Sequence, residues 1–251
     1  MAFVYCRMQE NELPREKGVK KAWLGGYAML PSDIQRIDSS FPFFSPVNEM
    51  DLPLIEIVTV TPSTPHSIRE GHLLRHAMFV LSGSVRIHKI GKQGKEITLY
   101  RVQKGQCCAL MMASILGETP YEASASIEME TEILLLPIPL FKRWMDTNPL
   151  LKPYIFKQIT QRITSVTNLL ENVAFQPIPY RIADYLIRQS DENEAVLKIT
   201  HEQLAIELGT AREVVSRCLK DFVQKKILLS RRGRLQILDR SLLLETLNSD
   251  G

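Results

Sequence analysis

The stretch that decides the fold is THEQLAIELGTAREVVSRCLKDFVQKKILL, residues 200–229. Thr200 lies three residues before Gln203. Thr210 lies three residues before Glu213 in the same way. In such a pair the threonine side chain accepts a backbone N–H, and the later side chain reaches back to the first residue, which is a capping box. The stretch therefore predicts two helix starts ten residues apart.

A glycine, Gly209, lies between the two predicted helices, where it suits a tight turn. A helix of about two turns, a glycine turn and a longer second helix form the helix-turn-helix arrangement, whose second helix enters the major groove of DNA. We therefore predict a DNA-binding regulator of transcription that has no catalytic residues.

Apolar residues recur in the second helix at steps of three and four, which predicts a buried stripe. Its members are Val214, Val215, Cys218, Leu219, Phe222 and Val223. The residues expected to contact DNA are Thr210, Arg212, Glu213, Ser216, Arg217 and Lys220. Arginine can bond both acceptors of guanine and glutamate can accept from cytosine, each contact giving about 1–3 kcal/mol of base discrimination. The alternative is a solvated face on which Glu213 only caps the helix.

Two short apolar runs follow the second helix and flank a basic tip that contains a glycine, which predicts a β-hairpin, the wing of a winged helix. We expect Arg231 and Arg232 of this tip to contact DNA phosphates. Residues 212–234 hold eight basic and two acidic side chains, a local net charge of +6. Such a patch favours phosphate contact, although a charged run is also typical of an ordinary wet surface.

The composition is typical of a soluble globular chain, with 45% hydrophobic and 24% charged residues in 251. The net charge is only +3, so the basic character is local to the C-terminal part. No apolar run approaches the length of about 18 residues that spans a membrane, and the first residues have no secretory pattern. The four cysteines show no disulfide spacing, which fits a reducing compartment. We expect a cytoplasmic protein without a membrane partner.

Short apolar runs separated by turn residues predict an all-β barrel or a jelly roll (β-roll) over residues 41–145. The clearest strands are Leu54–Val60, Ala77–Leu81, Val85–Ile90, Ile97–Val102 and Ile133–Leu136. The fold class is therefore α+β. We expect four parts: a variable extension over 1–40, the β-roll over 41–145, a helix over 146–175 and a winged helix-turn-helix over 176–251.

The helical segment carries an apolar seam with the alternating steps of a two-stranded coiled coil. Its members are Ile159, Ile163, Val166, Leu170 and Val173. We expect this seam to join two copies of the chain, because helix-turn-helix proteins commonly bind paired half-sites. The alternative is that the seam packs on the β-roll of its own chain.

The order of β-roll, long helix and winged helix resembles the Crp/Fnr superfamily of bacterial transcription regulators over roughly residues 43–247. The resemblance depends on REGHLLRHAMFVLSGSVRIHK (69–89), KQGKEITLYRVQKGQ (92–106) and ITHEQLAIELGTAREVVSRCLKDFVQKKIL (199–228). The family's base-contacting motif is Glu, two variable residues, Ser or Gly, and Arg. Residues 213–217 (EVVSR) match its Fnr-like version, and Arg212 matches an arginine of the Crp-like version. The resemblance implies binding to an inverted repeat and recruitment or obstruction of RNA polymerase.

The resemblance is partial in the β-roll, which senses a small molecule in that family. Cyclic-nucleotide binders open their cassette with Gly-Glu and close it with an arginine that pairs with the phosphate. This chain has Gly105-Gln106 at the opening and Tyr121-Glu122-Ala123 near the close, which argues against cyclic AMP. Cys6 alone cannot supply the N-terminal cysteine cluster of the family's iron–sulfur sensors, which argues against that cofactor too.

Cys107 and Cys108 lie in the expected ligand cassette and are candidate sensor residues for redox chemistry or a soft metal. The alternative is that both are small buried apolar residues. Histidines could supply a haem ligand or a metal site; they are His66, His72, His76 and His88.

Two other functions stay open. One is a ligand-independent regulator, whose affinity for DNA no signal changes. The other is a cupin-like metal enzyme, because His76 precedes FVLSGS, although the His-x-His pair and glutamate of a cupin are absent.

Overall fold

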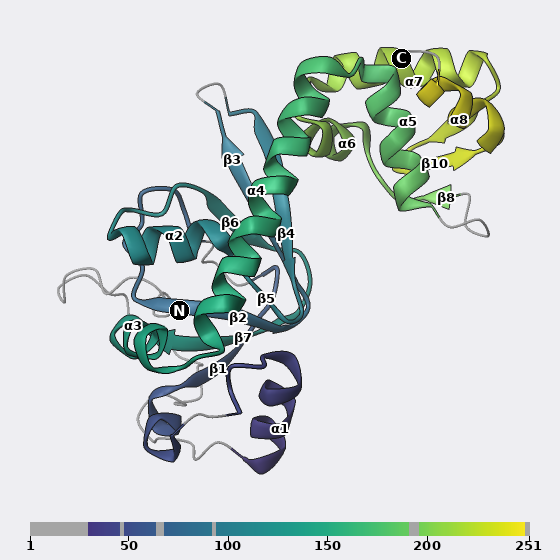
Figure 1. Ribbon diagram of the computed structural model, residues 1–251. Helices are drawn as coiled ribbons and strands as arrows, with labels where there is room; N and C mark the ends of the chain where they lie inside the picture. The colour runs from purple at the N-terminus through teal and green to yellow at the C-terminus, as the bar shows by residue number, and fades with distance from the viewer. Residues whose placement is uncertain (1–29, 46–47, 64–67, 92–93, 191–195, 249–251) are drawn as a thin grey trace, which may run out of the picture. The chain divides into compact units, whose positions relative to one another are not determined.

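The computed structural model describes residues 30–45, 48–63, 68–91, 94–190 and 196–248 (Figure 1). The chain divides into two compact units, one made of residues 1–88 and 100–163, and the other of residues 89–99 and 164–251. The expected α+β class, with an N-terminal β-roll, a long helix and a C-terminal helix-turn-helix, is confirmed.

The strands of the β-roll form two antiparallel sheets. In chain order they are β1 (Glu56–Val60), β2 (His76–Ser82), β3 (Ser84–Ile90), β4 (Glu96–Gln103), β5 (Gln106–Cys107), β6 (Ser124–Ile127) and β7 (Thr131–Pro137). One sheet has the order β1-β7-β2-β5 and the other the order β4-β3-β6. The five strands expected from the sequence are present. Strands β5 and β6 were not expected, because β5 is two residues long and β6 alternates serine with small apolar residues.

A cluster of aromatic rings fills one end of the β-roll. Phe41 and Phe43 lie with their ring centroids 5.5 and 5.2 Å from that of Phe79 on β2. The ring of Tyr154, from the long helix, lies 5.0 Å from that of Phe43. Tilted and edge-on rings at these distances are favourable beyond the area they bury. This cluster fixes the first turns of the long helix on the β-roll.

The helices of this part of the chain are α1 (Pro31–Ser40), the 3₁₀ helix η1 (Glu49–Leu54), α2 (Ala109–Gly117), α3 (Ile138–Thr147) and α4 (Leu151–Phe175). Helix α1 was not expected, because residues 1–40 were interpreted as an extension. Its Ile37 is fully buried, and the helix contacts β2, so residues 31–40 pack on the β-roll. Helix α4 has three buried residues, all in its first third: Leu151, Ile155 and Gln158.

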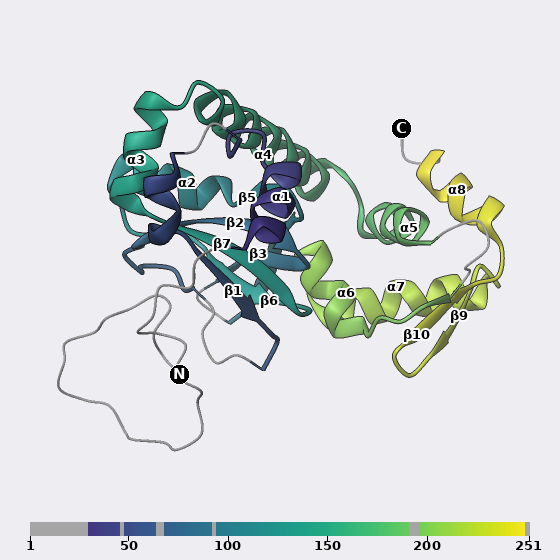
Figure 2. The ribbon, with the colours of Figure 1, turned by 90° about the horizontal axis from the view of Figure 1, so that it is seen from below.

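The described residues of the C-terminal part form four helices and a small sheet. Figure 2 shows the hairpin of this sheet beside α7. The elements are α5 (Ile178–Gln189), β8 (Val196–Leu197), α6 (His201–Leu208), α7 (Arg212–Gln224), β9 (Leu228–Arg231), β10 (Arg234–Ile237) and α8 (Arg240–Asn248). The sheet order is β8-β10-β9. Its core combines the buried faces of α5, α6 and α7 with β9, β10 and Leu243 of α8.

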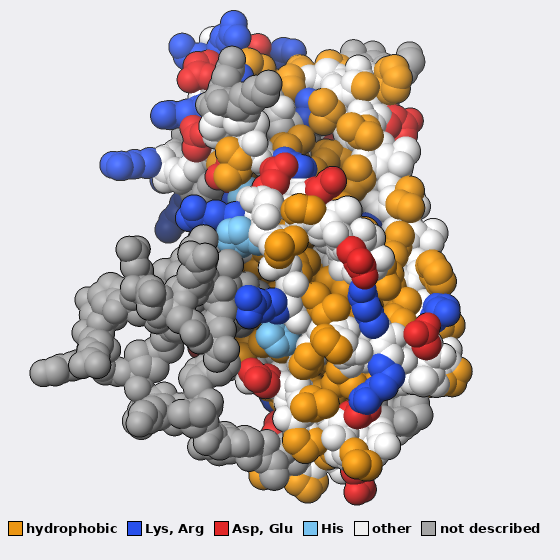
Figure 3. All heavy atoms as spheres, turned by 90° about the vertical axis from the view of Figure 1, so that its left-hand side faces the viewer, with side chains coloured by type: hydrophobic (Ala, Val, Ile, Leu, Met, Phe, Trp, Pro, Cys, Tyr) orange, Lys and Arg blue, Asp and Glu red, His pale blue; other side chains and the backbone are white. Residues whose placement is uncertain are grey.

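Hydrophobic and charged side chains are interspersed on the face drawn in Figure 3. Scattered apolar surface of this kind is normal for a folded chain and needs no special explanation. No helix among the described residues is both long and apolar enough to cross a lipid bilayer.

Candidate nucleic-acid interface

The first predicted capping box is present at the start of α6. The Gln203 N–H donates to Thr200 Oγ1 at 3.1 Å, and the Thr200 N–H donates to Gln203 Oε1 at 2.9 Å. The helix ends at Gly209, whose φ of +61° lies in the left-handed region that glycine adopts without a steric cost. The expected helix, turn and second helix are therefore confirmed.

The prediction of a second capping box, formed by Thr210 and Glu213, is wrong. Helix α7 begins at Arg212, with Ala211 as its N-cap and no side-chain cap hydrogen bond. The backbone N–H of Thr210 instead donates to the carbonyl of Ala205 at 3.0 Å and so closes the end of α6. Thr210 belongs to the turn because the reversal at Gly209 needs one more residue to satisfy the last carbonyls of α6.

The buried stripe of α7 is narrower than predicted. Val215, Cys218, Leu219 and Phe222 are buried, and Val214 is half-buried. Val223 is 36% exposed, so its assignment to the stripe is wrong. At about 100° per residue, position 223 lies about a quarter-turn from the centre of the stripe, at its edge.

The polar residues of α7 share one face. Glu213, Ser216, Arg217 and Lys220 fall within a sector of about 100°, opposite the buried stripe. Glu213, Arg217 and Lys220 are exposed, and Ser216 is half-buried. Arg212 is exposed at the first turn of the helix. The structure therefore places on the surface the cationic side chains that the sequence assigned to DNA contact.

One histidine links the polar face of α7 to the β9–β10 hairpin by hydrogen bonds. His201 Nδ1 is hydrogen-bonded to Ser216 Oγ at 2.9 Å, and His201 Nε2 to Ser230 Oγ at 3.2 Å. Burial, followed by the nearby charge of Arg212, lowers the pKa of His201 below its ordinary value. The neutral ring thus links the start of α6, the middle of α7 and strand β9. The role of His201 could not be predicted from the sequence, because its partners lie 15 and 29 positions away with no periodic signal between them.

The wing is a tight hairpin. Arg231 pairs with Arg234 across a turn whose Gly233 has a φ of +70°. Arg231, Arg232 and Arg234 are all exposed. Strand β8, which was not expected from the sequence, pairs with β10 and makes the hairpin part of a three-stranded sheet.

The exposed arginines of this surface hold no partner within the described residues. None of Arg212, Arg217, Arg231 and Arg232 makes a hydrogen bond or ion pair with another described side chain. A guanidinium without an intramolecular partner keeps its donors available for phosphate or guanine.

The apolar seam on α4 lies mostly on the surface. Ile163 is 63% and Leu170 64% exposed, Val173 is also exposed, and Ile159 and Val166 are half-buried. The buried residues of the helix, Leu151, Ile155 and Gln158, are not members of the seam, and the pairing of the seam with a second copy stays a prediction. Phe156, three residues before Ile159, is 58% exposed and extends the seam by one position.

Cys107 and Cys108 are both buried free thiols. Burial raises the pKa of Cys107 strongly, and neighbouring Cys108 adds to the shift. Because the thiolate is the reactive form, this burial does not support a redox role for Cys107. Cys108 Sγ lies 3.4 Å from Tyr100 Oη and 3.3 Å from Tyr121 Oη.

Tyr121, near the close of the predicted ligand cassette, is fully buried, whereas its neighbour Glu122 is exposed. The buried side chain at this position is thus a phenol, and the carboxylate of Glu122 faces solvent. The hydroxyl of Tyr121 is already paired with Cys108.

The candidate metal ligands are scattered. Among the described residues no group of three or more His, Cys, Asp or Glu side chains lies close enough to hold a metal ion. His72 Nδ1 accepts the backbone N–H of Arg69 at 3.3 Å, His76 is half-buried and His88 is buried. His66 and Cys6 lie outside the described residues.

Two family models match this chain, one over most of the β-roll and the other over the winged helix-turn-helix. A model of the cyclic nucleotide-binding domain matches residues 67–148, and a model of the Crp-like helix-turn-helix domain matches residues 180–246. Residues 67–148 include both β-roll sheets except β1, and residues 180–246 include the whole α6–turn–α7 unit and the wing.

Similar whole proteins are transcription regulators. The chain is 27% identical over 182 residues to the transcriptional regulator SdrP of Thermus thermophilus, covering 68% of this chain and 84% of that protein. It is 25% identical over 182 residues to the cAMP-activated global transcriptional regulator CRP of Salmonella typhimurium, covering 69% of this chain and 85% of that protein. A solved structure assigned to the Crp/Fnr family, from Eubacterium rectale, superposes with a TM-score of 0.72 at 27% identity, covering 84% of this chain and all of that chain.

A β-roll, a long helix and a winged helix-turn-helix with a basic surface define a DNA-binding transcription regulator. The chain belongs to the Crp/Fnr superfamily and is a transcription regulator of that type.

Proposed function

We propose that the chain works as a homodimer in the cytoplasm, binds an inverted-repeat operator, and recruits or obstructs RNA polymerase there. Each α7 enters a major groove, and each wing contacts the neighbouring phosphates. A signal other than cyclic AMP, received at the β-roll, controls the affinity for DNA.

The polar sector of α7 carries this proposal. Glu213, Arg217 and Lys220 point away from the core and are exposed, so they can reach base edges and phosphates when the helix lies in a groove. The wing adds exposed Arg231 and Arg232, which suit sequence-independent phosphate contact. Thr210 lies in the turn before α7, where its hydroxyl suits phosphate contact, because its backbone N–H already donates to the carbonyl of Ala205.

Ser216 has a different role from its neighbours in the same sector. Its hydroxyl is already bonded to His201, so the histidine fixes its orientation before DNA arrives. A side chain that is held in place loses less conformational entropy on binding.

The exposed seam of α4 supports dimerisation. Phe156, Ile163 and Leu170 recur every seven residues, and each is more than half exposed. Large apolar side chains in such a row, when left in water, favour pairing with a second helix of the same kind. Two copies related by a twofold axis would present two α7 helices to an inverted repeat.

A matched pair of arginine variants tests the proposal. Arg217→Ala should weaken binding to the selected operator by about 1–3 kcal/mol and relax the preference at one base pair in each half-site. Arg69→Ala, an exposed arginine of the β-roll, is the control and should leave the affinity unchanged. Fluorescence anisotropy with operator and random duplexes measures both. An equal loss for Arg217→Ala on both duplexes would remove this residue from base recognition.

A further inference from the structure

The first residues of strand β4 pack on the helix-turn-helix. Residues 89–99, which include them, belong to the same compact unit as residues 164–251. Thr98 is only 6% exposed, and its Oγ1 donates to Glu207 Oε1 of α6 at 3.2 Å. The two residues are 109 positions apart, so this contact depends on the fold and not on any local pattern in the sequence.

Ile97 lies against the glycine turn between α6 and α7. A Cβ atom built on Gly209 would lie 2.5 Å from Ile97 Cδ1 and 3.0 Å from Ile97 Cγ1. The isoleucine therefore occupies the space that a side chain at position 209 would need. Gly209 is favoured there for two reasons, its φ of +61° and the close approach of β4.

The other end of the same strand is anchored in the β-roll. Tyr100 and Val102 are buried, and β4 pairs with β3 along one sheet. The chain also reaches the helix-turn-helix through α4, but α4 and α5 are joined by only two non-helical residues, Gln176 and Pro177. Strand β4 thus gives the helix-turn-helix an attachment to the β-roll that does not depend on this short link.

The contact leaves the DNA-contacting face of α7 uncovered. Ile97 and Thr98 reach the end of α6 and Gly209, whereas Arg212 and the charged members of the polar sector of α7 stay exposed. The contact is therefore compatible with α7 entering a groove, and it favours support of DNA binding over blockage. Helix-turn-helix dimers bind half-sites at a fixed spacing, which requires both reading helices to be held in place.

We propose that Ile97 and Thr98 are positioning residues, which hold the helix-turn-helix in the orientation that operator binding needs without themselves touching DNA. Without their contacts the helix-turn-helix turns about the link between α4 and α5, and only a fraction of the dimers presents both α7 helices at the spacing of the operator. The apparent affinity then falls by that fraction. The contact is independent of DNA, whereas its consequence for spacing rests on the proposed function as an operator-binding dimer.

Hydrogen exchange of the full-length chain without DNA tests the contact. Ile97→Ala removes the side chain that covers Gly209, so the amides of residues 209–211 should exchange about threefold faster or more. Ile90→Ala is the matched control, because Ile90 lies on β3 of the same β3–β4 hairpin and is 49% exposed. It should leave exchange at residues 209–211 unchanged. Equal exchange in Ile97→Ala and the unmodified chain would overturn the proposal.

Operator duplexes of altered spacing test the consequence. The selected inverted repeat is compared by fluorescence anisotropy with duplexes that carry one or two extra base pairs between the half-sites. Ile97→Ala should bind the selected repeat about fivefold or more weakly than the unmodified chain, and the altered duplexes equally well, because it loses only the fixed orientation. Thr98→Val, which removes the hydroxyl at equal size, should show the same selective loss at about twofold or more, and Thr98→Ser should match the unmodified chain.

The outcomes separate the two proposals. An unchanged spacing preference in Ile97→Ala, or equal losses on every duplex, would overturn the positioning role. No spacing preference in the unmodified chain, together with faster exchange in Ile97→Ala, would instead refute the proposed function and leave the contact of β4 with the helix-turn-helix standing.

Discussion

The hydrogen bonds of His201 allow a quantitative prediction for His201→Ala. The substitution removes two hydrogen bonds, of 2.9 and 3.2 Å, from half-buried positions. A typical intramolecular hydrogen bond contributes about 0.5–1.5 kcal/mol net, and the two serine hydroxyls left behind can regain water because they are not fully buried. We therefore expect the free energy of unfolding to fall by about 1–2 kcal/mol.

Operator affinity should fall as well, by about two- to twelvefold. Ser216 loses the partner that orients it, and ordering one side chain at an interface costs about 0.5–1.5 kcal/mol. The assays are urea unfolding followed by circular dichroism and anisotropy with operator DNA. His201→Ala with Ser216→Ala completes a double-mutant cycle, in which the two stability losses should overlap by about 1 kcal/mol.

The pH dependence of stability provides a separate readout. Because the folded-state pKa of His201 lies below its ordinary value of 6.5, the unfolded chain binds the proton more readily. The stability that comes from His201 is thus fully present above pH 6.5 and is lost as the pH falls below it. His76, whose pKa burial also lowers, contributes in the same direction, so His201→Ala should reduce the pH dependence without abolishing it. Additive losses in the cycle, or an unchanged pH dependence, would refute the proposed link between His201 and α7.

Three further perturbations address other parts of the molecule. Arg231→Ala with Arg232→Ala should lower affinity for every DNA sequence and reduce the slope of log affinity against log salt by about 1–2, and an unchanged slope would exclude the wing from the interface. Ile163→Glu with Val166→Glu should convert dimers to monomers in analytical ultracentrifugation, because each seam position would bring like charges together, and an unchanged mass would exclude the seam. Thr200→Ala should lower the free energy of unfolding by about 1 kcal/mol through loss of the helix cap, and an unchanged midpoint in urea would show that the cap contributes little.

Local signals in the sequence predicted local structure well. The Thr200–Gln203 pair and Gly209 are sufficient to place α6 and its turn, because a capping box and a left-handed glycine involve only neighbouring residues. The same reasoning failed at Thr210, since the residue after Gly209 is needed to end α6 and cannot also begin α7. The assignment of Val223 to the buried stripe was wrong for a related reason. The spacing of an apolar residue at the edge of a stripe does not show whether that residue faces the core or the solvent.

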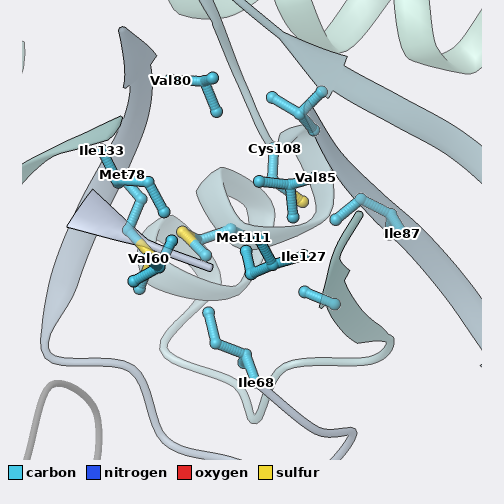
Figure 4. Close-up of a pocket in the computed structure, with 12 residues that line it drawn as sticks. Val60, Ile68, Met78, Val80, Val85, Ile87, Cys108, Met111, Ile127 and Ile133 are labelled. Atoms are coloured by element: carbon cyan, nitrogen blue, oxygen red, sulfur yellow. The ribbon is translucent and has the colours of Figure 1, made fainter. Parts of the chain in front are cut away.

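Contacts between distant segments could not be predicted. The apolar space between the two sheets of the β-roll, shown in Figure 4, is lined by residues from position 60 to position 133, and only the pairing of the strands brings them together. The Cys107-Cys108 pair suggested reactive thiols, yet burial between the two sheets gives Cys108 a hydrogen-bonding role instead. The apolar repeat of α4, in contrast, can be read from the sequence because all its members lie on one helix, and its role in dimerisation stays a prediction.

Selection of bound sequences from a pool of random duplex DNA is the most direct measurement of whether two copies of α7 recognise DNA together. We predict enrichment of an inverted repeat whose half-sites have centres about one helical turn, 10–10.5 base pairs, or a multiple of a turn apart. Arg217→Ala should lose information at one position in each half-site and keep the spacing. Enrichment of a single half-site without a symmetric partner, or no enrichment above the starting pool, would contradict this mode of recognition.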